Sequence, residues 1–288
     1  INLLSAFAGC ARQAYNFPAQ TTVLQMTTVQ IILSLLSGGI VGLSLGLVGG
    51  GGSILAVPLM VYLVGTSSPH VAIGTSAVAV AANALMNLLG HARERNVKWP
   101  CATVFAVAGI AGAALGAEAG KAVDGTKLLA AFGVLMIVIA ALMLRPRRGG
   151  DDPAVRLDMI SGPRLLPPLA GTGFGVGALS GFFGIGGGFL IVPGLVTATS
   201  MPLLNAIGSS LVSVAAFGAT TAVSYALSGL VDWQLALLFI VGGAFGGFVG
   251  IRLARKLSAK RRALTLIFSA VVAIVGIYVL LKGISGYL

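Results

Sequence analysis

Two glycine-rich stretches interrupt the apolar sequence of this chain: LVGGGGSILAVPL at Leu47–Leu59 and FFGIGGGFLIVPG at Phe182–Gly194. In both, a short apolar run and a proline follow the glycines. Glycine disfavours the interior of a helix by about 1 kcal/mol per residue relative to alanine. Clusters this dense therefore predict breaks between helices, and their recurrence predicts an internal duplication.

The composition is that of a membrane protein. Of the 288 residues, 57% are hydrophobic and only 9% are charged, whereas soluble domains are about a quarter charged. Continuous apolar runs of about 20 residues recur, which is the length that a membrane-spanning helix needs. These features predict an all-α polytopic membrane protein. The net charge of +11 is attributed to loops that orient the helices, so no nucleic-acid partner is expected.

The chain matches itself at an offset of 134 residues. AIGTS at Ala72–Ser76 corresponds to AIGSS at Ala206–Ser210, and VKW at Val97–Trp99 corresponds to VDW at Val231–Trp233. We therefore predict two repeats. The predicted divisions are an N-terminal segment 1–28 with no assigned role, a first transmembrane repeat 29–144, a basic cytoplasmic linker 145–164 and a second transmembrane repeat 165–288.

Each repeat is predicted to contain five helical segments. In the first repeat they are Val29–Val48, Ser53–Gly65, Val71–Gly90, Trp99–Ala117 and Leu128–Leu144. In the second they are Leu165–Phe183, Phe189–Thr199, Leu203–Ser228, Trp233–Ile251 and Ala263–Leu281. The second segment of each repeat is short, since about 13 residues at 1.5 Å each cover only about 20 Å.

Basic residues predict the orientation, because 14 of the 18 lie in three connecting regions. These are Arg93, Arg95, Lys98; Arg145, Arg147, Arg148, Arg156, Arg164; and Arg252, Arg255, Lys256, Lys260, Arg261, Arg262. The positive-inside rule requires all three regions to face the cytoplasm. They do so only if each repeat crosses the membrane an odd number of times. The repeats are therefore predicted to be inverted, with five crossings each, or three if the first two segments form a re-entrant pair; five is favoured.

The glycine breaks are interpreted as an anion site. A helix that begins at Gly188 presents unpaired N–H groups and the positive end of its dipole. Interrupted helices at matching positions of inverted repeats indicate the binding site of a transporter near the bilayer midplane. The predicted binding residues are Gly49, Gly50, Gly51, Gly52, Ser53, Gly186, Gly187 and Gly188. Close helix packing is instead assigned to glycines spaced at three and four residues: Gly109, Gly112, Gly116, Gly242, Gly243, Gly246, Gly247 and Gly250.

Polar residues of the third segment of each repeat are further candidates for binding. Thr75, Ser76, Ser209 and Ser210 carry hydroxyls that can donate to an oxyanion, or equally cap their helix or bond a preceding carbonyl. Asn83 and Asn87 lie four residues apart on one helix face. They either line a path or bond a neighbouring helix.

The repeated motifs resemble those of the sulfite exporter TauE/SafE family of membrane permeases. The resemblance rests on the doubled glycine break with its proline, the AIGTS and AIGSS elements, and the tryptophan that opens the fourth segment, at Trp99 and Trp233. It covers the chain from about Val29 onward. It implies export of small sulfur-containing oxyanions such as sulfite, sulfonates or sulfoacetate across a prokaryotic inner membrane. Ile185 and Gly188 stand where the first repeat has Gly50 and Ser53, so the two half-sites are unequal.

Residues typical of other protein classes are missing. All seven acidic residues lie in loops or at helix ends, and the two histidines have no partner at metal-ligand spacing. We expect no catalytic residues, no metal and no cofactor, and partners limited to a small anion and the lipid bilayer, with room for a homo-oligomer. The alternatives to a carrier are a channel-like anion pore and, less favoured, an intramembrane enzyme. Glu118 and His91 are assigned to the membrane interface in preference to a proton relay. Arg93 and Arg95 could gather anions at the cytoplasmic mouth, although topology alone accounts for them.

Overall fold

The computed structural model describes residues 27–66, 68–94, 96–144, 162–256 and 261–285. These residues form helices, with no strand among them. Eight helices are long and apolar enough to cross a membrane, and two further apolar helices are shorter. The predicted class, an all-helical polytopic membrane protein, is thereby confirmed. The N-terminal segment and most of the central linker lie outside the described residues.

The helices follow the predicted segments closely. In the first half they are α2 (Thr28–Val48), η1 (Gly49–Leu55), α3 (Ala56–Pro58), η2 (Leu59–Val64), α4 (Pro69–Arg93), α5 (Trp99–Ala122) and α6 (Gly125–Leu144). In the second half they are α7 (Gly162–Phe183), α8 (Gly188–Thr199), α9 (Leu203–Leu227), α10 (Trp233–Lys256) and α11 (Arg261–Ser285). The largest differences are at the ends of α5 and α10, which run past the predicted Ala117 and Ile251, because the long side chains of Lys and Arg let a helix continue into the membrane interface.

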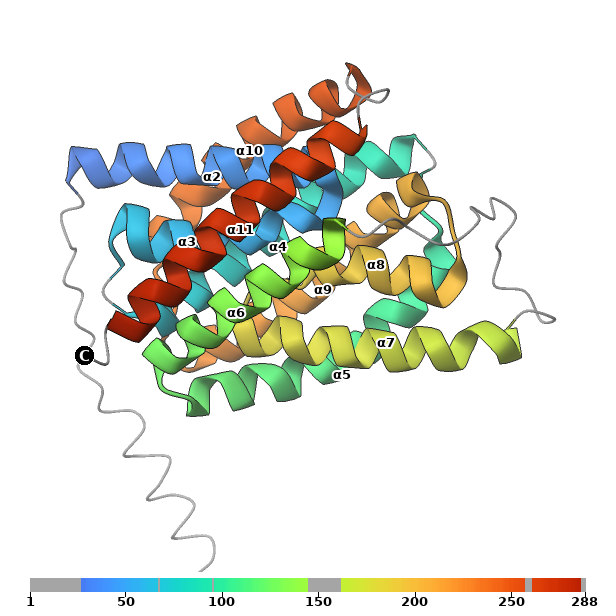
Figure 1. Cartoon of the computed structure of the whole chain (residues 1–288), viewed down its shortest axis with the longest axis horizontal. Helices are drawn as coiled ribbons and strands as arrows, with labels where there is room; N and C mark the ends of the chain where they lie inside the picture. The colour runs from blue at the N-terminus through green and yellow to red at the C-terminus, as the bar shows by residue number, and fades with distance from the viewer. Residues whose placement is uncertain (1–26, 67, 95, 145–161, 257–260, 286–288) are drawn as a thin grey trace, which may run out of the picture.

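Glycine contacts join the two halves through parallel helices. Along α2, methyl groups at Gly38 and Gly42 would collide with the backbone of α10 at Phe239 and Gly243. The same ascending register joins α5 to α7, where Gly112 meets Phe174 and Gly116 meets Ala178. The packing role predicted for these spaced glycines is confirmed. Figure 1 shows α2 beside α10 and α5 beside α7 on opposite sides of the bundle.

Equivalent helices of the two halves run antiparallel. Gly74 near the start of α4 meets Tyr225 near the end of α9, whereas Gly218 earlier in α9 meets Ala77 and Ala81. In the pair formed by α6 and α11, the Ser269 hydroxyl donates to the carbonyl of Ala140 at 3.1 Å. Antiparallel pairing of equivalent helices is the arrangement that two repeats of opposite orientation require.

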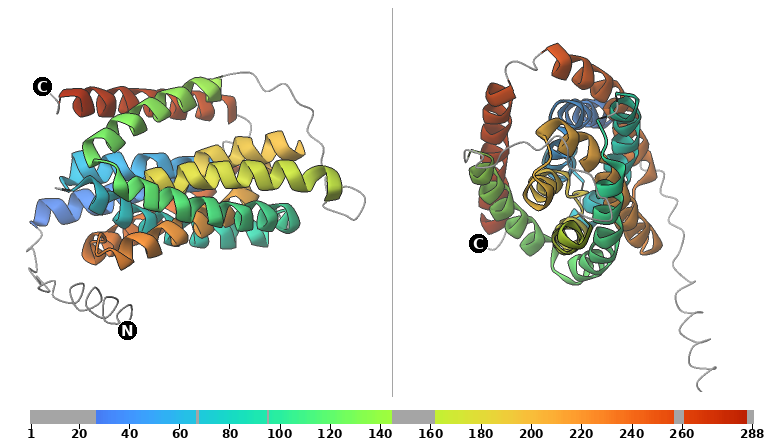
Figure 2. Two further views of the ribbon diagram at one scale, coloured as in Figure 1. Left: turned by 90° about the horizontal axis from the view of Figure 1, so that it is seen from below. Right: turned by 90° about the vertical axis from the view of Figure 1, so that its right-hand side faces the viewer.

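The helices α4 and α9 form the centre of the bundle. They are the most buried of the candidate membrane spans. Helices α6 and α11 lie together on one flank (Figure 2). Large exposed apolar side chains, such as Val107, Phe245 and Ile274, face outward as a lipid-embedded surface requires. Residues near the middle of α4 and α9 therefore lie deep inside the protein.

Candidate functional site

The glycine break of the second half is an irregular turn that ends in a short helix. Gly184, Gly186 and Gly187 have left-handed φ angles of +66°, +64° and +64°, a conformation that glycine adopts at little cost. Helix α8 begins at Gly188, as the sequence predicted, and has 12 residues. It is therefore about 18 Å long, shorter than the hydrocarbon core of a bilayer, which is about 30 Å thick.

This break lies at the centre of the molecule. A methyl group at Gly186 would lie 3.0 Å from Cγ1 of Val80 and 3.3 Å from Cγ1 of Val214. Val80 and Val214 occupy equivalent positions of the two halves, close to the midpoints of α4 and α9, and both are fully buried. The N-terminus of α8, with its unpaired amides and positive dipole end, is thus placed near the middle of the bundle.

A buried hydroxyl beside this helix start was not predicted. Ser180 lies near the end of α7, and a methyl group at Gly187 would come within 2.8 Å of its Oγ atom. The side chain is fully buried, and its Oγ atom has no hydrogen-bond partner among the described residues. A buried polar group without a partner is uncommon and calls for an explanation; a bound ligand that accepts its proton is one. The only feature of the sequence that could have pointed to this hydroxyl is the position of the serine, one helical turn before the glycines.

The first-half glycines differ from the prediction. Gly49, Gly50, Gly51, Gly52 and Ser53 belong to a 3₁₀-helix, η1, instead of an open break. None of them has a left-handed φ angle, so the tight helical winding continues through the glycines. Gly52 folds back onto Ser44 and Leu45 of α2, and η1 packs against α8. The two breaks therefore lie side by side, as expected, but their backbones are unequal.

Two of the hydroxyls predicted to bind the anion connect the halves. Thr75 Oγ1 accepts a hydrogen bond from the backbone N–H of Asp232, and Ser209 Oγ accepts one from the N–H of Lys98, both at 2.9 Å. The preceding glycines, Gly74 and Gly208, leave room for the loop of the opposite half. The AIGTS and AIGSS motifs therefore have a structural role, although each hydroxyl keeps a proton to donate.

Ser76 and Ser210 form the local bonds that the sequence left as an alternative. Their hydroxyls donate to the carbonyls of Ile73 and Ile207 at 2.9 and 2.8 Å. Ser76 also lies 3.5 Å from the carbonyl of Gly184, which ties α4 to the second break. Binding of an anion by these two hydroxyls stays a prediction.

The amides of α4 face α10. The Nδ2 atom of Asn83 donates to the carbonyl of Phe239 at 3.4 Å, and that of Asn87 donates to the carbonyl of Asn83 at 2.9 Å. Both side chains are buried. They fit against Gly243 and Gly247, whose missing side chains leave the space.

A cavity opens where α4 and α10 approach the face predicted to be cytoplasmic. We call it the basic groove; its volume is about 460 Å³. Its lining residues are Met86, Asn87, Leu89, Gly90, Arg93, Glu94, Ala244, Phe248, Ile251 and Arg252. The guanidinium of Arg252 lies 3.7 Å from the centre of the Phe248 ring. The sequence explained Arg93 by topology, with anion gathering at the cytoplasmic mouth as the alternative, and gave no sign of a cavity.

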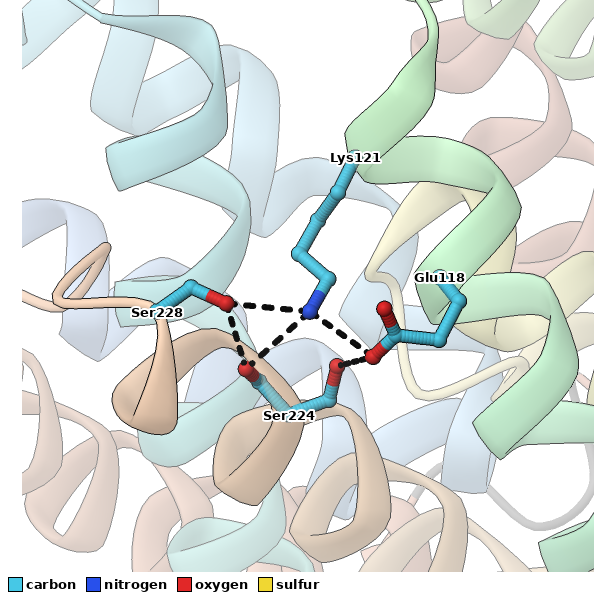
Figure 3. A network of polar contacts seen from close by, with 4 residues as sticks. All are labelled: Glu118, Lys121, Ser224 and Ser228. Carbon is cyan, nitrogen blue, oxygen red and sulfur yellow. Dashed lines mark hydrogen bonds and ion pairs between the residues drawn. The ribbon is translucent and has the colours of Figure 1, made fainter. Parts of the chain in front are cut away.

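A polar network closes the equivalent crossing at the opposite end, between α5 and α9. Lys121 Nζ lies 2.7 Å from Oε1 of Glu118 and donates to Ser228 Oγ at 3.0 Å, while Ser224 Oγ donates to the same Glu118 oxygen at 2.8 Å. Figure 3 shows the lysine pointing into the group formed by the other three residues. We call these four residues the outer network.

The basic groove and the outer network occupy corresponding positions in the two repeats. At the offset of 134 residues, Glu118 corresponds to Arg252, and Ser228 corresponds to Glu94. The outer end of one crossing therefore carries a polar network, whereas the corresponding end of its counterpart carries a cavity. Among the described residues, no group of three or more histidines, cysteines, aspartates or glutamates could hold a metal ion.

Comparison with known proteins gives one family. Residues 34–279 match the family described as sulfite exporter TauE/SafE. A "Probable membrane transporter protein" of Xylella fastidiosa (strain 9a5c) is 49% identical over 88% of this chain and 97% of its own length. The "Probable membrane transporter protein YunE" of Bacillus subtilis (strain 168) is 30% identical over 90% of this chain and 99% of its own. No solved structure matches the chain.

Proposed function

This chain belongs to the sulfite exporter TauE/SafE family, and from that membership we propose that it carries small sulfur-containing oxyanions outward across the membrane. Candidate substrates are sulfite, sulfonates and sulfoacetate. The observation that carries the proposal is the start of α8 at Gly188, beside a buried hydroxyl, at the centre of the bundle.

The chemistry of this centre suits an oxyanion. The first amides of α8 lack acceptors within the helix, and the dipole favours negative charge at that end. Ser180 Oγ can donate a further hydrogen bond to a sulfonyl oxygen. None of these donors brings a permanent charge into the membrane, where an unpaired charge is costly. An anion that arrives here is stabilised by dipoles and hydroxyls, and it can also leave.

Alternating access is supported by the difference between the two crossings. The outer network joins α5 to α9, whereas the equivalent crossing of α4 with α10 is open as the basic groove. In a carrier built from inverted repeats, the two repeats exchange conformations as the site turns from one face to the other. We therefore propose that this conformation is closed to the outside and open toward the cytoplasm.

A binding screen tests the substrate class. Sulfite, sulfate, thiosulfate, taurine and sulfoacetate are titrated into the purified protein, and at least one sulfur oxyanion is expected to bind. Ser180→Ala should weaken that binding about tenfold, the equivalent of 1.4 kcal/mol. Ser37→Ala removes another fully buried hydroxyl without a hydrogen-bond partner and should leave the affinity unchanged. If none of the five compounds binds, the proposed substrate class is wrong.

A further inference from the structure

The basic groove combines a cationic rim, a polar floor and apolar walls. Arg93 and Arg252 are both exposed, and Glu94 is the one acidic residue in the lining, so the lining carries a net positive charge. Asn87 lies in the lining but is buried, which places an amide at the inner end. Met86, Leu89 and Phe248 supply apolar surface.

Arg252 is held beside an aromatic ring of the groove. Its guanidinium lies over the Phe248 ring at 3.7 Å, a cation–π contact that is favourable by about 0.5–1 kcal/mol at exposed sites. The contact restrains the position of the guanidinium beside the ring, and Arg252 is exposed, so its N–H groups can reach an anion in the groove. Guanidinium groups bind planar pairs of oxyanion oxygens through such N–H groups.

A row of amides leads from the groove toward the centre. Asn83 lies one turn of α4 deeper than Asn87, and Val80, which contacts the central break, lies one turn deeper still. The other half has no such row, because the residues at the corresponding positions are Phe217 and Thr221. Phe217 is fully buried and stacks on Phe105 at 6.2 Å. Buried amides are therefore confined to the helix that lines the groove, where they pack against Gly243 and Gly247 of α10.

We propose that the basic groove is the cytoplasmic capture site of the carrier, where Arg93 and Arg252 bind the oxyanion beside Asn87 before it moves to the centre. This inference rests on the proposed function. The volume of about 460 Å³ exceeds what a bare sulfite fills, and the apolar walls suit the short carbon chain of an organic sulfonate. The groove therefore takes organic sulfonates in preference to inorganic sulfite. A lipid tail is the poorer fit, because it would lie on the buried amide of Asn87.

Initial transport rates into inside-out membrane vesicles test this site. Arg93→Gln and Arg252→Gln should each raise the KM for sulfoacetate about tenfold and leave the maximal rate unchanged, since the central site is intact. Phe248→Leu should raise the KM less, because Arg252 keeps its charge but loses its contact with the ring. Lys127→Gln, which removes a cation from an exposed position at the outer start of α6, is the matched control and should behave as the wild type.

Three results would overturn the inference. In the first, the wild-type protein transports sulfoacetate and both arginine variants have the same KM as the wild type. The capture site is then wrong, and the proposed function stands. Another is an effect of the variants that appears in liposomes containing phosphatidylglycerol but not in pure phosphatidylcholine, because the groove then binds a lipid headgroup. If the wild-type protein neither binds nor transports any sulfur oxyanion, the proposed function falls and the capture site with it.

Discussion

At the scale of single residues, Gly186 and Gly229 have nearly the same backbone conformation in different surroundings. Their φ angles are +64° and +69°. Gly186 is enclosed by Val80 and Val214, whereas a methyl group at Gly229 would meet no atom within 4 Å. A side chain in left-handed backbone costs about 1–2 kcal/mol at either position. The pair therefore separates the effect of backbone strain from that of crowding at the centre.

Gly186→Ala should lower sulfite transport at least tenfold, because the added methyl group pushes against both valines and displaces the start of α8. Gly229→Ala should lose similar stability but keep wild-type transport. Transport is measured in proteoliposomes, and thermal unfolding in detergent confirms that both variants are folded. Equal transport by the two variants would show that the central break is not part of the transport path.

The Thr75 and Ser209 hydroxyls are predicted to stabilise the contact between the repeats. Thr75→Val keeps the shape of the side chain but leaves the part-buried N–H of Asp232 without its acceptor, which costs about 1 kcal/mol, the lower end of the range for an unsatisfied donor. Ser209→Ala should act in the same way on the N–H of Lys98. The control is Thr103→Val, whose exposed hydroxyl bonds a carbonyl of its own helix. A thermal unfolding temperature of Thr75→Val equal to that of this control would contradict the assignment.

At the scale of elements, local composition predicted the helices and one of the two breaks. Apolar runs gave the segments, and Gly186–Gly188 gave the start of α8. The sequence also predicted an open break at Gly49–Ser53, but these residues form η1. Glycine permits an open turn without requiring it, and what the backbone adopts depends on packing against α2 and α8. The partners of Thr75 and Ser209 lie in the opposite half, 157 and 111 residues away, so no local pattern could reveal them.

The outer network is predicted to favour the outward-closed conformation. Lys121→Met removes the cation that joins Glu118 to α9. The free energy of unfolding should change by less than about 1 kcal/mol, because Glu118 remains solvated. The equilibrium between conformations should nevertheless shift toward the outward-open state. The shift is measured with Val214→Cys in a protein whose Cys10 and Cys101 are replaced. The rate at which this cysteine reacts with a membrane-impermeant thiol reagent added outside reports how far the centre is open to that side.

Labelling of this cysteine should be several-fold faster with Lys121→Met than with the wild-type lysine. Lys127→Met, a change of the same kind at the start of α6 and outside the network, should not alter the rate. An unchanged rate with Lys121→Met would show that the network does not control outer access.

At the scale of the whole molecule, duplication and charge parity predict two repeats of opposite orientation. The offset of 134 residues identified the equivalent segments, and the basic loops required an odd number of crossings. The parallel pairs α2–α10 and α5–α7 and the antiparallel pairs α4–α9 and α6–α11 have the directions that this reasoning requires. The basic groove could not be predicted. The crossings of α4 with α10 and of α5 with α9 occupy equivalent positions in the two halves, and the sequence does not show which of them contains a cavity.

Counterflow of labelled sulfite in proteoliposomes tests most directly whether the protein is a carrier with one central site. We predict that unlabelled sulfite inside the liposomes accelerates uptake of labelled sulfite by the wild-type protein. The uptake should saturate with concentration, and Gly186→Ala should abolish the acceleration. Uptake that rises linearly with concentration and is indifferent to internal sulfite would indicate a pore and contradict this account.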